Sequence, residues 1–442
     1  MSVASNHHLE IVPSNITSDG KLSYKNGQPT IQLLIGAQER YIVPGSIRLC
    51  GNFTIMKDSA DIPADGDGIR MNERLGIYSV IDTLSIFSQN SGQTIESINH
   101  HNRMMSSYLS VTQSQGDFAC HAYETSLRFP NYKAQQVAVV ENTQGGSGGD
   151  SPNSFCIPLV SGLFMGLDPI PLSNQWGVGG IQIEIQLAPD QQVLFSDDNT
   201  DTNLLNAYYE LSNVRLICEV QSPSMDQMKQ IQSQTANTFT YNSISSYYNT
   251  INSANAILNF NLGLKSVLGA FMNVVPSGHI NSFTRDGLAT LPFTNSNGSV
   301  ANVEQAVFTR AGERFPLEYN IDTLQKTTAG NTTGDPQLIR NYMDAVMGFS
   351  KIARSSVDTS VWRNFDCGTN YLACKQIIKG GSAWGLGISY DQISNSGIDF
   401  SMVPFGMQLQ LGLTSDHPNA IFLFVHSRQT IVSSQGSIQV MK

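Results

Sequence analysis

Apolar and polar residues alternate along the stretch GIQIEIQLAP, which occupies positions 180–189. Isoleucine or leucine fills every second position from Ile181 to Leu187, and Gln or Glu fills the positions between them. Successive side chains of a β-strand point to opposite sides of the sheet. The alternation therefore predicts a strand with one face in a core and the other in a polar setting.

A stretch with the same pattern, GMQLQLGLTS at positions 406–415, follows about half a chain length later. A run rich in aromatic and β-branched residues comes after each copy, at positions 208–220 and 421–432. Any two strands of an all-β protein can resemble each other. The shared order, spacing and position in each half favour the hypothesis that the chain contains two tandem copies of one domain.

Other segments complete the predicted element order. Strands are expected from β-branched and aromatic runs bounded by turn signals, at positions 30–35, 46–55, 76–87, 123–129, 136–140, 154–159, 257–262, 267–275, 303–310 and 315–321. Helices are expected where apolar residues recur at helical spacing, at positions 96–110, 222–238 and 336–353. Residues 1–28 are polar and turn-rich, and we expect them to form an arm rather than part of a core.

These elements predict an all-β protein made of two tandem antiparallel jelly-roll β-sandwiches, with short helical insertions in loops. Eight strands in two sheets suit roughly 200 residues with large loops, so 442 residues accommodate two such units. We expect an N-terminal arm over residues 1–28, a first jelly roll over 29–222, a linker over 223–238 and a second jelly roll over 239–442.

Composition narrows the possible functions. Only 14% of the residues are charged, below the roughly 25% usual in globular domains, so the surface is built from uncharged polar residues that can lie against further copies of the chain. The formal net charge is −10 and Lys and Arg are scattered, which argues against a chain that grips nucleic-acid phosphates.

The six cysteines are widely spaced and include no C-x-x-C, so we expect reduced thiols and synthesis inside a cell. The N-terminal residues do not resemble a secretory signal peptide, and no apolar run approaches the ~18 residues of a membrane span.

A search for catalytic or binding residues yields none. A tandem sandwich could be a metal-dependent enzyme of the cupin kind, but none of the eight histidines is spaced as such a site requires. The pairs His7-His8 and His100-His101 and the single His426 are interpreted as structural or surface residues. The chain has no G-x-S-x-G, and the glycine-rich segment at 145–153 lacks the lysine of a phosphate-binding loop. We therefore expect no enzyme activity, no cofactor and no metal.

Three segments carry a resemblance to a known family. The segment SFCIPLVSGLFMG at 154–166 is followed by the alternating strand at 180–189 and by YYELSNVRLICEV at 208–220. This order resembles the end of the first domain in double jelly-roll major capsid proteins, most nearly those of Polinton-like viruses and virophages. RLCGNFTI at 48–55 and the segments after position 406 are similar to other parts of the same proteins. Residues 240–400 match only by the order of their elements.

The resemblance implies that three chains form a pseudo-hexagonal capsomer, and that capsomers tile an icosahedral shell around double-stranded DNA. The expected partners are further copies of the chain and penton and minor capsid proteins, in a virion assembled inside the host cell. The DNA would be enclosed without strong direct binding. Whether a membrane lines the shell is left open.

A lectin-like tandem sandwich that binds carbohydrate is the alternative. It would present exposed aromatic residues in loops, and Trp176, Trp362 and Trp384 are the candidates. Aromatic residues beside strands are more often buried, so the capsid hypothesis is preferred.

Overall fold

The structure is a computed structural model. It describes residues 6–57, 60–61, 71–112, 125–128, 153–195, 207–283, 288, 303–315, 320–322, 386–390, 397–411, 418–434 and 437–442, apart from positions 16–19, 26, 28, 73–74 and 235. All strand pairs within these residues are antiparallel. They form four sheets, two in each half of the chain, which confirms the predicted all-β class.

The first half contains two sheets, which we name by their central strands. The β12 sheet comprises β10 (Ile170–Pro171), β4 (Tyr41–Ile42), β12 (Ala207–Gln221), β5 (Arg48–Lys57) and β6 (Ala60–Asp61), with β1 (Asn6–Ile11) and β2 (Lys21–Leu22) on β12 and β9 (Asn153–Pro158) on β5. The β11 sheet comprises β3 (Thr30–Ile35), β11 (Ile181–Leu187), β7 (Ile81–Ser88) and β8 (Thr94–Asn99).

The second half repeats this plan. The β21 sheet comprises β13 (Asn237–Ile251), β21 (Asn419–Ser434), β15 (Val267–Pro276) and β19 (Leu386–Ser389), with β22 (Ser437–Met441) on β21. The β20 sheet comprises β14 (Asn255–Phe260), β20 (Phe405–Leu411), β16 (Val303–Arg310) and β17 (Glu313–Arg314), with β18 (Asn320–Asp322) on β16.

Strand order explains why the alternating pattern occurs twice. The strand β11 lies between the first two strands of its sheet in chain order, β3 and β7, and β20 lies between the first two of its sheet, β14 and β16. The long strand that follows each, β12 or β21, belongs to the opposite sheet. Equivalent neighbours in both halves are what tandem copies of one domain would have.

Burial follows the predicted alternation. Ile181, Ile183 and Ile185 of β11 are fully buried, and Met407 and Leu409 of β20 are at most 3% exposed. Gln186 and Gln408, which point the other way, are exposed. Each half therefore encloses apolar side chains between its two sheets, as a sandwich does.

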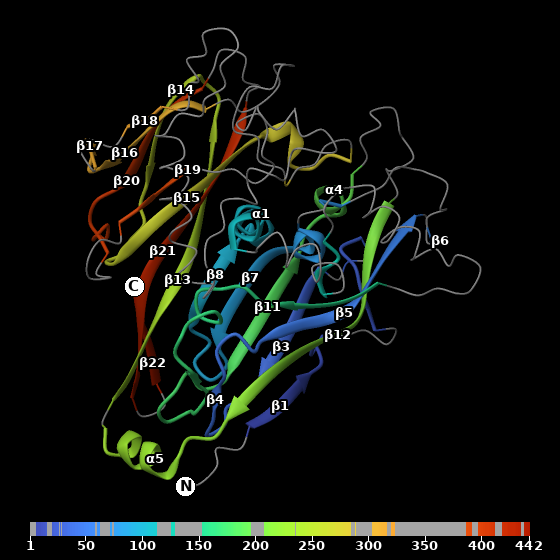
Figure 1. The fold of residues 1–442 in the computed structure, drawn as a ribbon, viewed down its shortest axis with the longest axis vertical. Helices are drawn as coiled ribbons and strands as arrows, with labels where there is room; N and C mark the ends of the chain where they lie inside the picture. The colour runs from blue at the N-terminus through green and yellow to red at the C-terminus, as the bar shows by residue number, and fades with distance from the viewer. Residues whose placement is uncertain are drawn as a thin grey trace.

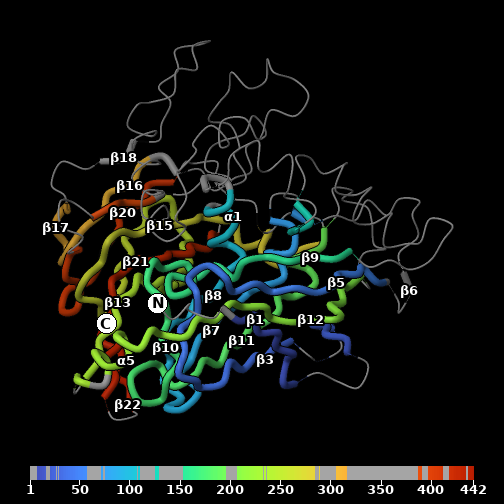
Figure 2. The backbone as a smooth tube through the Cα atoms, turned by 60° about the horizontal axis from the view of Figure 1, so that its bottom comes forward, coloured from blue at the N-terminus to red at the C-terminus, as the bar shows by residue number. Residues whose placement is uncertain are grey.

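The two sandwiches stand side by side. In Figure 1 the first, blue to green, lies on the right and the second, yellow to red, on the left, and Figure 2 shows the same arrangement after rotation. Helix α5 (Met225–Gln232) follows β12 and precedes β13 at the lower end of Figure 1. It begins with a capping box, in which the Ser224 side chain accepts from the Gln227 backbone and the Gln227 side chain from the Ser224 backbone.

Short helices complete the described structure. They are η1 (Gly76–Val80), α1 (His101–Thr112), α4 (Asp190–Val193) and η4 (Ser277–His279). No helix in this part of the chain is long and apolar enough to cross a bilayer.

The helix predicted at 96–110 begins later than expected. Residues before His100 form β8, which pairs with β7, and α1 starts at His101. The turn between them occurs at His100, whose φ is 56°, a conformation uncommon outside glycine. Because neither Gly nor Pro marks this turn, the apolar spacing runs through the boundary unbroken.

The N-terminal segment differs from the expected arm. Strand β1 pairs with β12 over Leu216–Gln221, β2 pairs with β12 further along, and Leu22 is fully buried in the core. The edge of β12 supplies backbone partners that the polar sequence of this segment does not reveal.

Strand β13 was not predicted, although its fifteen residues pair with β21 along their whole length. The strand expected at 123–129 is wrong where it can be seen, because the described residues 125–128 form no strand. The strand expected at 136–140, the helix at 336–353 and nearly all of the glycine-rich segment at 145–153 lie outside the described residues.

Candidate functional site

The junction between the two sandwiches is the most elaborate polar site in the described residues. Strand β8 of the first sandwich lies beside β13 of the second. The Tyr241 hydroxyl donates to the Ile95 carbonyl at 2.7 Å, and the Asn99 backbone N–H donates to the Ser246 hydroxyl at 2.7 Å. These bonds join residues nearly 150 positions apart, so the junction exists only in the folded chain.

Glu96 lies at the centre of the junction and is 2% exposed. Its carboxylate accepts the backbone N–H groups of Gly162 at 3.1 Å, Leu163 at 3.0 Å and Ile244 at 2.6 Å. The Ser161 hydroxyl donates a further bond. One side chain of β8 thereby ties the segment after β9 to a strand of the other sandwich.

Burial raises the pKa of Glu96, and the bonds from Ile244, Leu163, Ser161 and Gly162 act in the opposite direction. A buried backbone N–H without an acceptor costs about 1–3 kcal/mol, and Glu96 satisfies three of them. The carboxylate is therefore a structural connector between the sandwiches.

Gly162 allows the chain to pass close to β13. A Cβ atom at this position would lie 1.9 Å from the carbonyl oxygen of Asn242 and 2.8 Å from the Cα atom of Ser243. Both atoms belong to backbone, which a rotamer change cannot move. Only glycine fits here, and this gives the glycine of the PLVSGL motif a physical role.

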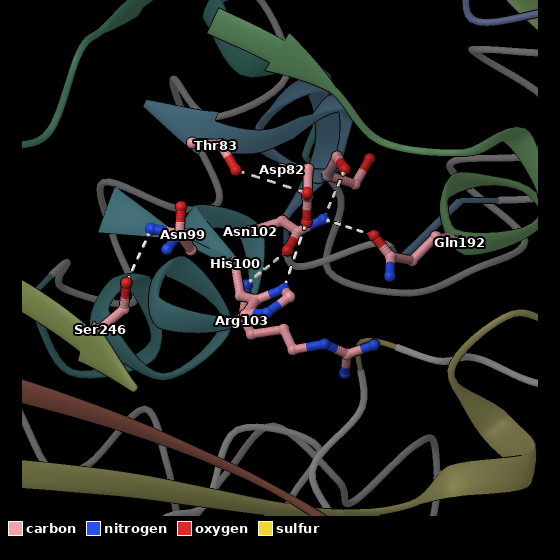
Figure 3. A network of polar contacts seen from close by, with 9 residues as sticks. Asp82, Thr83, Asn99, His100, Asn102, Arg103, Gln192 and Ser246 are labelled. Carbon is pink, nitrogen blue, oxygen red and sulfur yellow. Dashed lines mark hydrogen bonds and ion pairs between the residues drawn. The ribbon is translucent and has the colours of Figure 1, made fainter. Parts of the chain in front are cut away.

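The start of α1 forms a second group of contacts, drawn in Figure 3. The Asn102 amide donates to the Ser79 carbonyl and to the Gln192 side chain, both at 3.1 Å. Nδ1 of His100 lies 3.4 Å from the Asp82 carboxylate. These bonds fix the first turn of α1 against the β11 sheet and η1.

The same turn also contacts the second sandwich. The Arg103 guanidinium lies 4.4 Å from the centre of the Phe422 ring, and the His100 ring lies 4.8 Å from it. The Asn273 amide donates to the Arg103 carbonyl at 2.8 Å. Both ends of the β8–α1 segment are thus bonded across the junction.

The junction carries no arrangement suited to catalysis that we can identify in the described residues. Glu96 is bonded to backbone and to Ser161, and it is not among the residues that line the cavity beside the junction, which include Gly162, Tyr241 and Asn242. Within the same residues, no group of three or more His, Cys, Asp or Glu side chains is placed to hold a metal ion. What the geometry does provide is a fixed relative orientation of the two sandwiches.

His101 gives the junction a pH dependence. Its Nε2 donates to the Val160 carbonyl at 2.8 Å, and burial lowers its pKa to about 4, against the opposite effects of Val160 and Asp82. Between pH 4 and 6.5 the unfolded chain binds a proton that the folded chain does not. Stability therefore falls as pH drops through this window, by up to about 3 kcal/mol for this residue.

The variant His101→Gln tests this effect, because it keeps an N–H donor and cannot be protonated. We expect denaturant unfolding to show a smaller loss of stability between pH 7 and pH 4.5 in the variant than in the parent. Asp190, whose pKa burial raises to about 6, contributes with the opposite sign in both proteins. Equal losses in the two proteins would contradict the assignment.

The tryptophans proposed for the lectin alternative are only partly described. Trp176 is 6% exposed, donates to the Glu39 carboxylate and packs against Tyr41 with ring centres 5.0 Å apart. Trp176 is a largely buried aromatic residue that lines a cavity together with Tyr41, Phe239 and Ile431. Trp362 and Trp384 lie outside the described residues.

The predicted structural role of His426 agrees with its position, because it is 2% exposed within β21 and burial lowers its pKa to about 4. His7 and His8 are exposed on β1. Sequence reasoning did not identify Glu96. The sequence feature that could have pointed to Glu96 was a single charged residue between the apolar residues Ile95 and Ile98, in a chain with few charges.

Comparison with known proteins gives the class of fold. No protein-family model and no curated protein matches the chain. Among solved structures, the chain is similar to the PBCV-1 virus capsid (TM-score 0.56, 9% identity, 99% of this chain and 97% of that one) and to PBCV-1 VP54 fitted into a reconstruction of the virophage Sputnik (0.55, 9%, 100% and 98%). It is also similar to the Faustovirus major capsid protein (0.53, 9%, 98% and 91%). The chain has the double jelly-roll fold, which confirms the predicted fold class.

Proposed function

We propose that this chain is the major capsid protein of a virus. The observation that carries the proposal is the buried junction, which fixes two jelly rolls side by side as one unit through Glu96, Gly162 and the start of α1. The chain resembles solved structures of capsid proteins along nearly their whole length. The proposed units are jelly rolls over 29–222 and 239–442 and a linker over 223–238, with β1 and β2 of the N-terminal segment added to the β12 sheet of the first jelly roll.

The repeated fold suits a hexagonal lattice. Two similar sandwiches per chain offer two similar flanks, so three chains around a threefold axis present six nearly equivalent wedges. In a closed ring of three chains every flank contacts a neighbouring chain, so no interface is left open. Obligate interfaces of this kind often bury more than ~2,000 Å² of surface. Such trimers would tile an icosahedral shell around double-stranded DNA, with penton and minor capsid proteins at other positions and assembly inside the host cell.

The mass of the purified protein tests the assembly directly. We expect light scattering coupled to size exclusion to give three times 48.2 kDa. A compact monomer that persists at tens of micromolar in every buffer would contradict the proposal and favour the carbohydrate-binding alternative. Incubation with a panel of glycans would then test that alternative.

DNA binding should be weak at physiological salt. The chain has a formal net charge of −10 and no basic run, so it has few cations to exchange for the counterions of a duplex. We expect a filter-binding assay to give no submicromolar affinity. Tight binding that weakens steeply with added salt would contradict this prediction and show that the chain binds DNA directly through its phosphates.

A further inference from the structure

Two cysteines of the first sandwich face each other across neighbouring strands. Cys50 of β5 and Cys156 of β9 are directly paired in the antiparallel register, and their Sγ atoms are 3.0 Å apart. Both thiols are free. Cα atoms of directly paired antiparallel residues lie about 4.5–5.5 Å apart, which is within the range that a disulfide spans.

The pair lies on the outward face of the β12 sheet. The residues that alternate with the two cysteines, Leu49, Phe155 and Ile157, are at most 3% exposed and point into the core. Cys50 and Cys156 are half-buried, so a small reagent can reach them. Cys218 of β12 is the contrasting case, because it is fully buried and burial raises its pKa to about 11.

The surroundings of Cys50 suit it to act second in stepwise thiol chemistry. Burial and the adjacent Cys156 raise the pKa of Cys50 to about 12, while Arg48 and Arg215 act to lower it. Arg215 is the residue of β12 paired directly with Cys50. Burial, the largest cause, outweighs the two arginines, so Cys50 is a poor first nucleophile toward a reagent in solution. It is suited to act second, because the Cys156 sulfur lies 3.0 Å from its own.

We propose that Cys50 and Cys156 form a redox-responsive dithiol that closes to a cross-strand disulfide on meeting a low-molecular-weight disulfide. The Cys156 thiolate attacks one sulfur of the reagent RSSR and releases RS⁻, which leaves a mixed disulfide on Cys156. The Cys50 thiolate then attacks the Cys156 sulfur and releases the second RS⁻. The two cysteine protons end on the leaving groups, so one RSSR is reduced to two RSH.

Closure would add a covalent bond between β5 and β9, which are far apart in sequence. Cross-links that close long loops stabilise a fold chiefly by restricting the unfolded chain. A reducing cytosol keeps such a pair open, and an oxidising environment closes it. The reaction would proceed in a single chain or in an assembled shell, so its test does not depend on the proposed function.

Peptide mapping of the full-length chain tests the proposal. After incubation with oxidised glutathione, we expect the tryptic peptide 49–57, which contains Cys50, to be linked to the peptide that contains Cys156. The Tm should rise by at least a few degrees and return on addition of dithiothreitol. The variant Cys50→Ser should instead retain glutathione on Cys156, with no rise in Tm.

The variant Cys218→Ser is the matched control and should form the Cys50–Cys156 link as the parent does. Separate glutathione caps on Cys50 and Cys156 in the parent, with no link between them, would overturn the proposal. Links from either residue to another cysteine, or covalent dimers on a non-reducing gel, would also overturn it.

Discussion

Replacing Gly162 with alanine is expected to separate the two jelly rolls. The added Cβ would lie 1.9 Å from the Asn242 carbonyl oxygen, so the segment after β9 must move away from β13. That movement also breaks the bonds from Gly162 and Leu163 to the Glu96 carboxylate. Steric strain of about 1–3 kcal/mol and unsatisfied groups at about 1–3 kcal/mol each together approach the stability of a domain, ~5–15 kcal/mol.

Thermal unfolding and limited proteolysis measure this effect. The variant should melt at a markedly lower temperature, and a protease should cleave its linker at 223–238 sooner than in the parent. Gly36→Ala is the matched control, because a Cβ atom there meets nothing within 4 Å. If the Gly162→Ala and Gly36→Ala variants had the same melting temperature, Gly162 would not be required at the junction.

Replacing Leu411 with aspartate should abolish folding of the second jelly roll. Leu411 is 2% exposed and ends the inward-facing row of β20. The described neighbours of Leu411 itself, Val303 in register and Ala254 through its carbonyl, offer no counter-charge. Burying a carboxylate there would cost several kcal/mol, comparable to the whole stability of a domain. Expression should therefore yield aggregated or proteolysed protein.

The same strand supplies the control for this experiment. Gln408 lies on the exposed face of β20. The substitution Gln408→Asp should therefore leave the free energy of unfolding within about 0.5 kcal/mol of the parent value. A Leu411→Asp protein that folds with an unchanged Tm would mean that the inward face of this strand is wrongly assigned.

The sequence predicted the strands whose two faces differ. The expected strand at 30–35 coincides with β3, and the two alternating stretches contain β11 and most of β20. In each, one face packs in a core and the other does not, so alternation in the sequence mirrors burial in the structure. The tandem arrangement could be inferred for the same reason.

The junction could not be predicted because its bonds are long-range. Glu96 binds groups 66 and 148 positions away, and no local pattern encodes such contacts. Strand β13 was missed because Asn and Ser, which favour turns, interrupt the Thr and Tyr residues that favour strands, and few aliphatic residues mark an inward face. Its strand conformation follows from pairing with β21 and from its position against β8.

Electron microscopy of the purified protein tests the central claim most directly, because it images the shape of the assembly. The proposed capsid role predicts particles with threefold symmetry and a hexagonal outline, and sheets or shells at high concentration. The Gly162→Ala variant should yield neither. Fields of uniform compact monomers from the parent protein, with no larger species at any concentration, would contradict the claim.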